Sequence, residues 1–131
     1  MKNEQKIMRK ILFRGKTKIG KWVKGDYHTY SEKGDTDNYI GISSNESDPF
    51  IVIPETVGQF TGLIDKNRVD IFEGDICESK EIDLKFVVKW HNEMSGYGAF
   101  KDGETVPFSW FSENKDIEII GNFYDNPELL N

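Results

Sequence analysis

The stretch DLKFVVKW, Asp83–Trp90, decides the fold class of this chain. Apolar and aromatic residues occupy every second position from Leu84 to Trp90, and lysines stand at two of the positions between them. Because successive side chains of a strand point to opposite faces of a sheet, this alternation predicts a strand with one buried face. No segment carries a long apolar stripe of helical period, so the sequence indicates a mainly β protein.

Further strand signals lie on both sides of this stretch. Gly74–Glu78 precedes it, and Val106–Phe111 and Ile117–Tyr124 follow it. About five short strands at this close spacing predict a small β-barrel. Pro107 has no N–H group for a sheet ladder, which indicates an edge strand. Asn126 followed by Pro127 is typical of the start of a helical turn.

The first half of the chain is less regular. Lys10–Arg14 and Lys21–Lys24 predict a first hairpin. The segment Asp26–Asn38 is rich in Asp, Gly, Ser and Thr, and we predict a loop there. Phe50–Ile53 and Gln59–Ile64 predict two further strands.

These signals divide the chain of 131 residues into two parts. We predict a β-rich N-terminal subdomain over residues 1–64, in which residues 1–8 are a flexible extension, packed on the barrel over residues 65–131.

The single cysteine excludes a disulfide within the chain and a cysteine zinc site. The longest apolar run, Phe50–Ile53, is too short to span a membrane, and the charged start carries no secretion signal. We therefore expect a cytoplasmic protein without a membrane partner.

Charge is distributed unevenly along the chain. Met1–Asp26 holds nine Lys/Arg and two acids, a net +7, and the remainder of the chain carries −13, which together give the net charge of −6. Such asymmetry indicates either a nucleic-acid arm or a basic hairpin that packs on an acidic body, within one chain or between subunits. We favour the hairpin, because an acidic body repels phosphates. The candidate basic surface consists of Arg9, Lys10, Arg14, Lys16, Lys18, Lys21 and Lys24.

Carboxylates are the one group of side chains that suggests a reaction. Asp65, Asp70, Glu73 and Asp75 lie close together in the sequence, and paired carboxylates could bind a hard cation or act as acid and base. The Gly-Asp pair before the next strand is also a common turn, in which the carboxylate accepts backbone N–H groups, and we favour this structural role. His28, His91 and Cys77 lie in no catalytic or metal-binding pattern, and we expect Cys77 to be a buried thiol. We therefore predict no catalytic residues, no metal site and no cofactor.

Aromatic residues gather in the second half of the chain. Trp110 and Phe111 are adjacent, so they cannot both point inward from a regular strand. An exposed aromatic surface could bind an extended peptide, stack nucleic-acid bases or form a subunit interface, unless a loop or the N-terminal subdomain covers it. The candidate interaction surface consists of Trp90, Tyr97, Phe100, Phe108, Trp110 and Phe111.

Several motifs resemble those of one family in their order along the chain. They are ILFRGK (11–16), GKWVKGD (20–26), IPETVGQFTGLIDKN (53–67), IFEGDI (71–76), VVKW (87–90) and IIGNFYDNPELL (119–130). On these motifs the chain resembles the YopX family of phage and prophage proteins. The resemblance implies a C-terminal SH3-like β-barrel, a phage or prophage origin and a bacterial cytoplasmic setting. It implies no reaction and no catalytic residues.

Three functional hypotheses follow. The leading one is a non-enzymatic, oligomeric interaction protein whose partner is a second copy, a phage protein or a host protein. The alternative is binding of single-stranded nucleic acid by the basic hairpin and the aromatic residues. The acidic body makes nucleic acid the less favoured partner. The third hypothesis is a metal-dependent enzyme that uses Asp70, Glu73 and Asp75.

Overall fold

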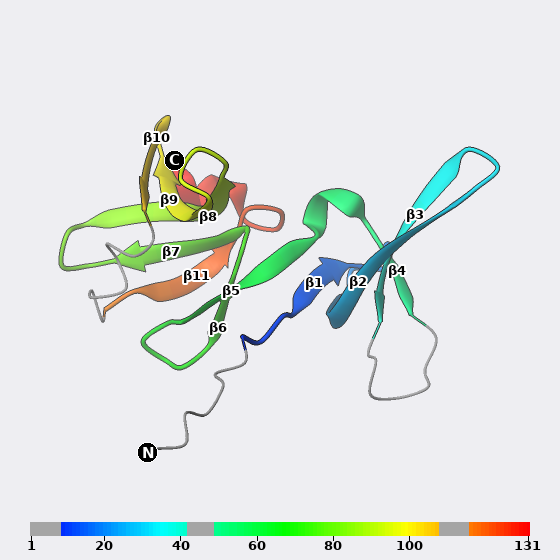
Figure 1. Cartoon of the computed structure of the whole chain (residues 1–131). Helices are drawn as coiled ribbons and strands as arrows, with labels where there is room; N and C mark the ends of the chain where they lie inside the picture. The colour runs from blue at the N-terminus through cyan, green and yellow to red at the C-terminus, as the bar shows by residue number, and fades with distance from the viewer. Residues whose placement is uncertain (1–8, 42–48, 108–115) are drawn as a thin grey trace, which may run out of the picture.

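Two antiparallel β-sheets make up most of the computed structural model, which describes residues 9–41, 49–107 and 116–131 (Figure 1). Strands make up most of the described residues, and the helical elements described there are two short 3₁₀ turns, which confirms the predicted mainly β class. The predicted extension over residues 1–8 lies outside the described residues.

The first sheet has six strands in the order β4-β3-β2-β1-β5-β6. They are β1 (Phe13–Lys16), β2 (Trp22–Glu32), β3 (Asp35–Gly41), β4 (Phe50–Val52), β5 (Gly58–Ile64) and β6 (Asp70–Phe72), with a single 3₁₀ turn, η1 (Pro54–Thr56), between β4 and β5. The predicted first hairpin is present, because β1 and β2 pair from Phe13 opposite Gly25 to Lys16 opposite Trp22.

The prediction of a loop over Asp26–Asn38 was wrong. β2 continues to Glu32 and pairs with β3 from Asp26 opposite Gly41 to Glu32 opposite Asp35. The connection is a two-residue turn in which Lys33 (φ 53°) and Gly34 (φ 88°) both adopt positive φ, as a tight hairpin turn requires. This ribbon, Asp26–Gly41, is called the arm below. β4 pairs with its base, from Asn38 opposite Val52 to Ile40 opposite Phe50, and its tip extends away from the rest of the molecule (Figure 1).

The second sheet has five strands in the order β10-β9-β8-β7-β11. They are β7 (Asp75–Ser79), β8 (Leu84–His91), β9 (Gly96–Lys101), β10 (Glu104–Pro107) and β11 (Glu118–Asn122), followed by a 3₁₀ turn, η2 (Pro127–Leu130). The strand predicted from DLKFVVKW is β8 and lies at the centre of this sheet. β10 and β11 stand at its two open edges, so the described strands do not confirm the closed SH3-like barrel, which stays a prediction.

Two local predictions from proline positions are confirmed. Pro107 ends β10, which is an edge strand. Pro127 begins η2, and Asn126 precedes it as predicted. The Asn126 side chain does not cap η2, however, because its Oδ1 accepts the backbone N–H of Asn122 at 3.2 Å.

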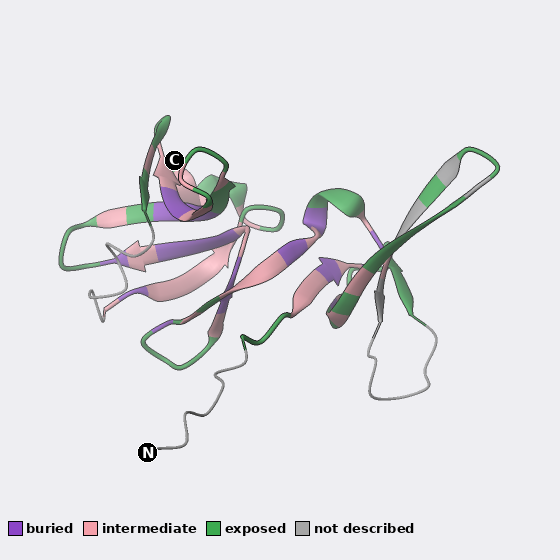
Figure 2. Cartoon of the chain, in the orientation of Figure 1, coloured by how far each residue is buried: buried purple, intermediate pink, exposed green. Residues whose placement is uncertain are grey.

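The larger hydrophobic core lies between the second sheet and the β5–β6 hairpin. Its buried members are Ile71, Cys77, Phe86, Val88, Ala99 and Ile117. A smaller core in the first sheet contains Val23 and Val52, with Phe13, Tyr27 and Val57 packed against them. Figure 2 shows buried residues along β7 and β8 and mostly exposed residues along the arm.

The β5–β6 hairpin connects the two sheets. β5 pairs with β1 in the first sheet, whereas Ile71 of β6 is 1% exposed in the core of the second sheet. The proposed boundary between residues 64 and 65 therefore falls inside a hairpin that belongs structurally to both halves. The division into domains stays a prediction.

One close backbone contact holds this hairpin against the turn before β7. A Cβ atom added to Gly58 would lie 2.4 Å from the Glu73 carbonyl oxygen, which is too close for two unbonded atoms. Gly58 therefore allows β5 to approach the backbone of residue 73.

We expect Gly58→Ala to lower the free energy of unfolding by about 1–3 kcal/mol, because the backbone has to move. The matched control is Gly96→Ala, whose new Cβ would meet no atom nearer than 3.7 Å, and which should change stability by less than about 0.5 kcal/mol. Urea denaturation of both variants checks this. Equal effects in the two variants would contradict the role of the close contact.

Candidate functional site

A cleft of about 400 Å³ lies where the two sheets meet. The first sheet contributes β1, β2 and η1 to its walls, and the second contributes the turn before β7, part of β8 and the segment after β11. Its lining includes Arg14, Trp22, Glu55, Val57, Glu73, Lys89, Phe123 and Tyr124. A cleft between two folded units is a common position for a binding site.

A buried ion pair crosses the interface beside this cleft. Arg14 of β1 points toward the second sheet, and its Nη2 lies 2.7 Å from Oδ1 of Asp75, whose side chain is only 2% exposed. The other oxygen of Asp75 accepts the backbone N–H of Phe72 at 2.8 Å. Burial raises the pKa of Asp75, while Arg14 and the Phe72 N–H group oppose this shift. The Gly-Asp turn predicted from the sequence is thus present, with an arginine bound to its carboxylate.

Cations and aromatic rings alternate beside the cleft, and Arg14, Trp22 and Tyr124 of this set line it. The Arg14 guanidinium lies 5.0 Å from the ring centres of both Trp22 and Phe72. Lys24 lies 5.2 Å from the Phe72 ring, and Lys16 lies 5.9 Å from Trp22 and 5.3 Å from Tyr124. We call this set the cation–aromatic row: Lys24, Phe72, Arg14, Trp22, Lys16 and Tyr124. Each contact is favourable because the face of an aromatic ring attracts positive charge.

Asp125 ties the segment after β11 to the first hairpin. It accepts hydrogen bonds from the Lys16 ammonium at 2.6 Å, from Nε1 of Trp22 at 2.9 Å and from Nδ2 of Asn122 at 3.2 Å. These donors lower the pKa of Asp125 to about 2, with the Lys16 and Trp22 hydrogen bonds as the largest causes. The carboxylate is therefore charged at neutral pH.

Two donors at the cleft have no acceptor within the described part of the chain. Nε of Arg14 is buried and makes no hydrogen bond. The Lys89 ammonium lies over Phe100 at 4.3 Å and Phe123 at 5.8 Å, with no ion pair among the described residues. Glu55 and Glu73 also line the cleft, so it presents both charge signs beside its aromatic walls.

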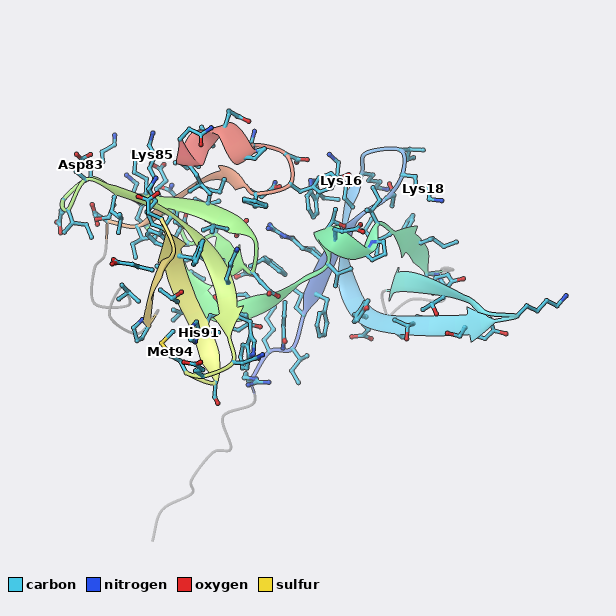
Figure 3. The ribbon with its side chains drawn as sticks, turned by 90° about the horizontal axis from the view of Figure 1, so that it is seen from above. Lys16, Lys18, Asp83, Lys85, His91 and Met94 are labelled. Carbon is cyan, nitrogen blue, oxygen red and sulfur yellow. The ribbon has the colours of Figure 1, made fainter. Side chains whose placement is uncertain are left out.

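Three residues of the candidate basic surface form ion pairs, and the other four are exposed without one among the described residues. Arg14, Lys16 and Lys10 form ion pairs with Asp75, Asp125 and Asp70 at 2.7, 2.6 and 3.0 Å. The basic hairpin thus packs on the acidic body, as we favoured from the sequence, and these three contacts lie within one chain. Exposed residues form the rest of the set, namely Arg9, Lys18, Lys21 and Lys24, and Figure 3 shows Lys18 farther from the second sheet than Lys16.

The candidate aromatic surface is brought together only in part. Trp90 is 48% exposed and meets Tyr97 edge to face at 5.2 Å. Phe100 lies opposite Val87, three positions along the ladder from the pair formed by Trp90 and Tyr97. Because side chains alternate along a strand, Phe100 points to the other face of the sheet. Phe108, Trp110 and Phe111 lie outside the described residues, and the proposed surface stays a prediction.

The three carboxylates of the metal-dependent enzyme hypothesis each have different neighbours. Asp70 pairs with Lys10, Asp75 pairs with Arg14, and Glu73 lines the cleft. Among the described residues, no group of three or more His, Cys, Asp or Glu side chains is placed to hold a metal ion.

In the part of the chain that the structure describes, no helix is long and apolar enough to cross a membrane.

The remaining polar candidates have structural surroundings. Cys77 is 0% exposed, and burial raises the pKa of its thiol, which confirms the expected buried cysteine. His28 stacks on Tyr39 at 5.3 Å in the arm. Nδ1 of His91 accepts the backbone N–H of Met94 at 3.3 Å (Figure 3).

Sequence reasoning missed Trp22, Lys89, Phe123 and Tyr124 as members of one site. A signal was present, because Phe123 and Tyr124 are adjacent and cannot both point inward from a regular strand. Both are about half exposed, at 49% and 46%. Nothing in their spacing indicated that Trp22, about one hundred residues earlier, would lie beside them.

Comparison with known proteins identifies a family and shows a similar solved structure. A family model described as "YopX protein" matches residues 12–131. The crystal structure of protein EF1440 from Enterococcus faecalis is similar in fold, with a TM-score of 0.54 and 22% sequence identity over 95% of this chain and 100% of that chain. No curated protein matches the sequence.

We expect Asp125→Asn to lower the free energy of unfolding at pH 7 by roughly 0.5–1 kcal/mol, because the lost ion pair is partly in water. The pKa of Asp125 is lowered from 3.8 to about 2 in the folded protein. Its charge therefore stabilises the fold above about pH 4, and this contribution is lost as the pH falls through 2.

Urea denaturation between pH 7 and pH 2 measures the difference between this variant and the parent protein, which should shrink toward zero at the acid end. Glu93→Gln is the control, since Glu93 is exposed and has no ion pair among the described residues. A difference that stays constant down to pH 2 would show that the effect arises from packing and not from charge.

Proposed function

The chain belongs to the YopX protein family, and from this premise we propose that it is a non-enzymatic interaction protein that self-associates through its arm. The observation that carries the proposal is the arm itself, a two-stranded ribbon whose described side chains lie largely in water on both faces. We propose that the protein acts in the cytoplasm of a bacterium that carries a phage or prophage, as the family resemblance implies.

The arm has few packing contacts of its own. Along β2, His28, Thr29, Tyr30 and Ser31 are all exposed, and Tyr30 is 55% exposed. The ribbon contains a stacked pair, His28 on Tyr39 at 5.3 Å, and a hydroxyl pair, Ser31 with Thr36 at 2.7 Å, and at its base Tyr27 packs on Phe13 at 5.4 Å. The pairing of β3 with β4 ends at Asn38, and a two-stranded ribbon such as the part beyond it is by itself only marginally stable in water. Contact with a second protein would supply the packing that the arm lacks.

Charge supports association between copies of this chain. The arm sequence, Asp26–Gly41, contains four acids and one lysine. The turn between β1 and β2 carries exposed Lys18 and Lys21. Surfaces of opposite sign on one molecule attract each other between copies, and symmetric homo-oligomers are the commonest assemblies of soluble proteins. A phage or host protein is the other partner that the proposal allows.

The non-enzymatic part of the proposal is supported by the roles of the described carboxylates. Asp75 and Asp125 hold cations of the first hairpin. Asp65 accepts the backbone N–H groups of Asn67, Val69 and Ile119. These are the contacts of turns and of sheet-to-sheet packing.

We expect the parent protein to scatter light as an oligomer at moderate salt and high protein concentration, and Tyr30→Glu to shift it toward the monomer. The added charge would make burial of this position costly. Ile82→Glu is the matched control, because Ile82 is 41% exposed in the turn before β8 and lies far from the arm. A parent protein that is strictly monomeric at both moderate and high salt would overturn the proposal.

A second candidate function, the binding of single-stranded nucleic acid, is favoured by the cation–aromatic row. Alternating cations and rings are typical of surfaces that bind phosphates and stack bases. If this function is correct, a labelled single-stranded oligonucleotide binds at low salt, its affinity falls steeply with added salt, and Lys24→Ala weakens it. Fluorescence anisotropy measures this. No binding at low salt would remove this candidate.

A further inference from the structure

We infer that the arm of one copy docks in the cleft of a second copy. This inference rests on the proposed self-association and identifies the surface that receives the arm. Both elements belong to the same chain. The cleft has half-exposed aromatic rings, and most of the described side chains of the arm are exposed.

The arm does not occupy the cleft of its own chain. In Figure 1 the tip of the β2–β3 ribbon points away from the second sheet, and the view from above in Figure 3 shows the same direction. The cleft, in contrast, lies between the base of the first sheet and the second sheet. An arm that enters a cleft of this kind therefore comes from another molecule.

The cleft presents half-exposed aromatic rings and an exposed cation. Phe123 and Tyr124 are 49% and 46% exposed, so covering them would remove apolar surface from water. Lys89 is exposed and has no ion pair among the described residues, so its ammonium group can pair with a carboxylate of an occupant. A suitable occupant brings an apolar body together with hydrogen-bond acceptors.

The arm brings both. Tyr30 is the most exposed tyrosine of the described residues, and a tyrosine combines a large apolar ring with a polar hydroxyl group. Four acids lie in the same ribbon, Asp26, Glu32, Asp35 and Asp37. Its one lysine, Lys33 at the tip, matches the carboxylates of Glu55 and Glu73 on the cleft wall. Charges of both signs are therefore complementary between the two surfaces.

Size and reach are compatible with this docking. A volume of about 400 Å³ lies within the usual range of ligand sites, and it suits the side chains of a ribbon better than a whole domain. From Asp26 to Glu32 the ribbon spans about 20 Å at ~3.3 Å per residue. Tyr30 lies opposite Asp37, just beyond the part of β3 that pairs with β4, and the arm continues past it to the turn at Lys33.

Docking of the arm into a cleft joins two different surfaces, which is a heterologous contact. Such contacts repeat from copy to copy and generate a closed ring or an open filament. Contact between two arms would instead give a symmetric dimer. The two arrangements can be separated by placing a cysteine on each surface.

The test uses two full-length variants, Tyr30→Cys and Phe123→Cys, oxidised separately and as a mixture. Cys77 is fully buried and does not compete. We expect disulfide-linked dimers in the mixture and little cross-linking of either variant alone. Cross-linking of Tyr30→Cys with itself would show arm-to-arm contact and overturn the inference, while the proposed self-association would stand.

Light scattering of the parent protein in the same buffer separates the two failures. An oligomer that gives no cross-link between positions 30 and 123 overturns only the docking into the cleft, whereas a strict monomer overturns the proposed function as well. As a second measurement, Lys89→Ala and Phe123→Ala should each weaken self-association by roughly tenfold, as changes at central contacts do. Lys80→Ala, in the exposed turn after β7, should leave self-association unchanged.

Discussion

The buried ion pair between Arg14 and Asp75 determines how the two sheets meet. Removing two charges from water is expensive, and removal of one partner from such a pair typically costs about 3–5 kcal/mol. Arg14 is held in the first sheet by the ladder of β1, and the carboxylate of Asp75 also accepts the N–H group of Phe72, at the end of β6. The pair therefore fixes the orientation of the first hairpin relative to the turn that begins the second sheet.

The chemistry of the cleft follows from that pair. The guanidinium lies between Trp22 and Phe72, so the sheets meet there through cations and rings, while the aliphatic cores lie elsewhere. Polar and aromatic contacts of this kind leave rings such as Phe123 half exposed. The same groups that join the sheets also form the surface that we propose receives the arm.

Sequence reasoning predicted the elements whose chemistry is local. Alternation predicted β8, and the Gly-Asp pair predicted the turn at Asp75, because both depend on neighbouring residues. The arm was missed because a ribbon in water on both faces has no apolar alternation to detect. The cleft was missed because its contacts join distant residues, such as Trp22 and Asp125, which lie 103 positions apart. Charge asymmetry predicted that the hairpin would meet an acidic body, but it did not identify the partners.

The ion pair between Lys16 and Asp125 also constrains the order of events during synthesis. The two residues are 109 positions apart, so at a ribosomal rate of about 5–20 residues per second the hairpin exists for roughly 5–20 s before Asp125 is made. In that interval β1 and β2 can pair, but their cations have no carboxylate from the end of β11. The wall that contains Phe123 and Tyr124 is thus added late, and the cleft is complete only after the rest of the fold is in place.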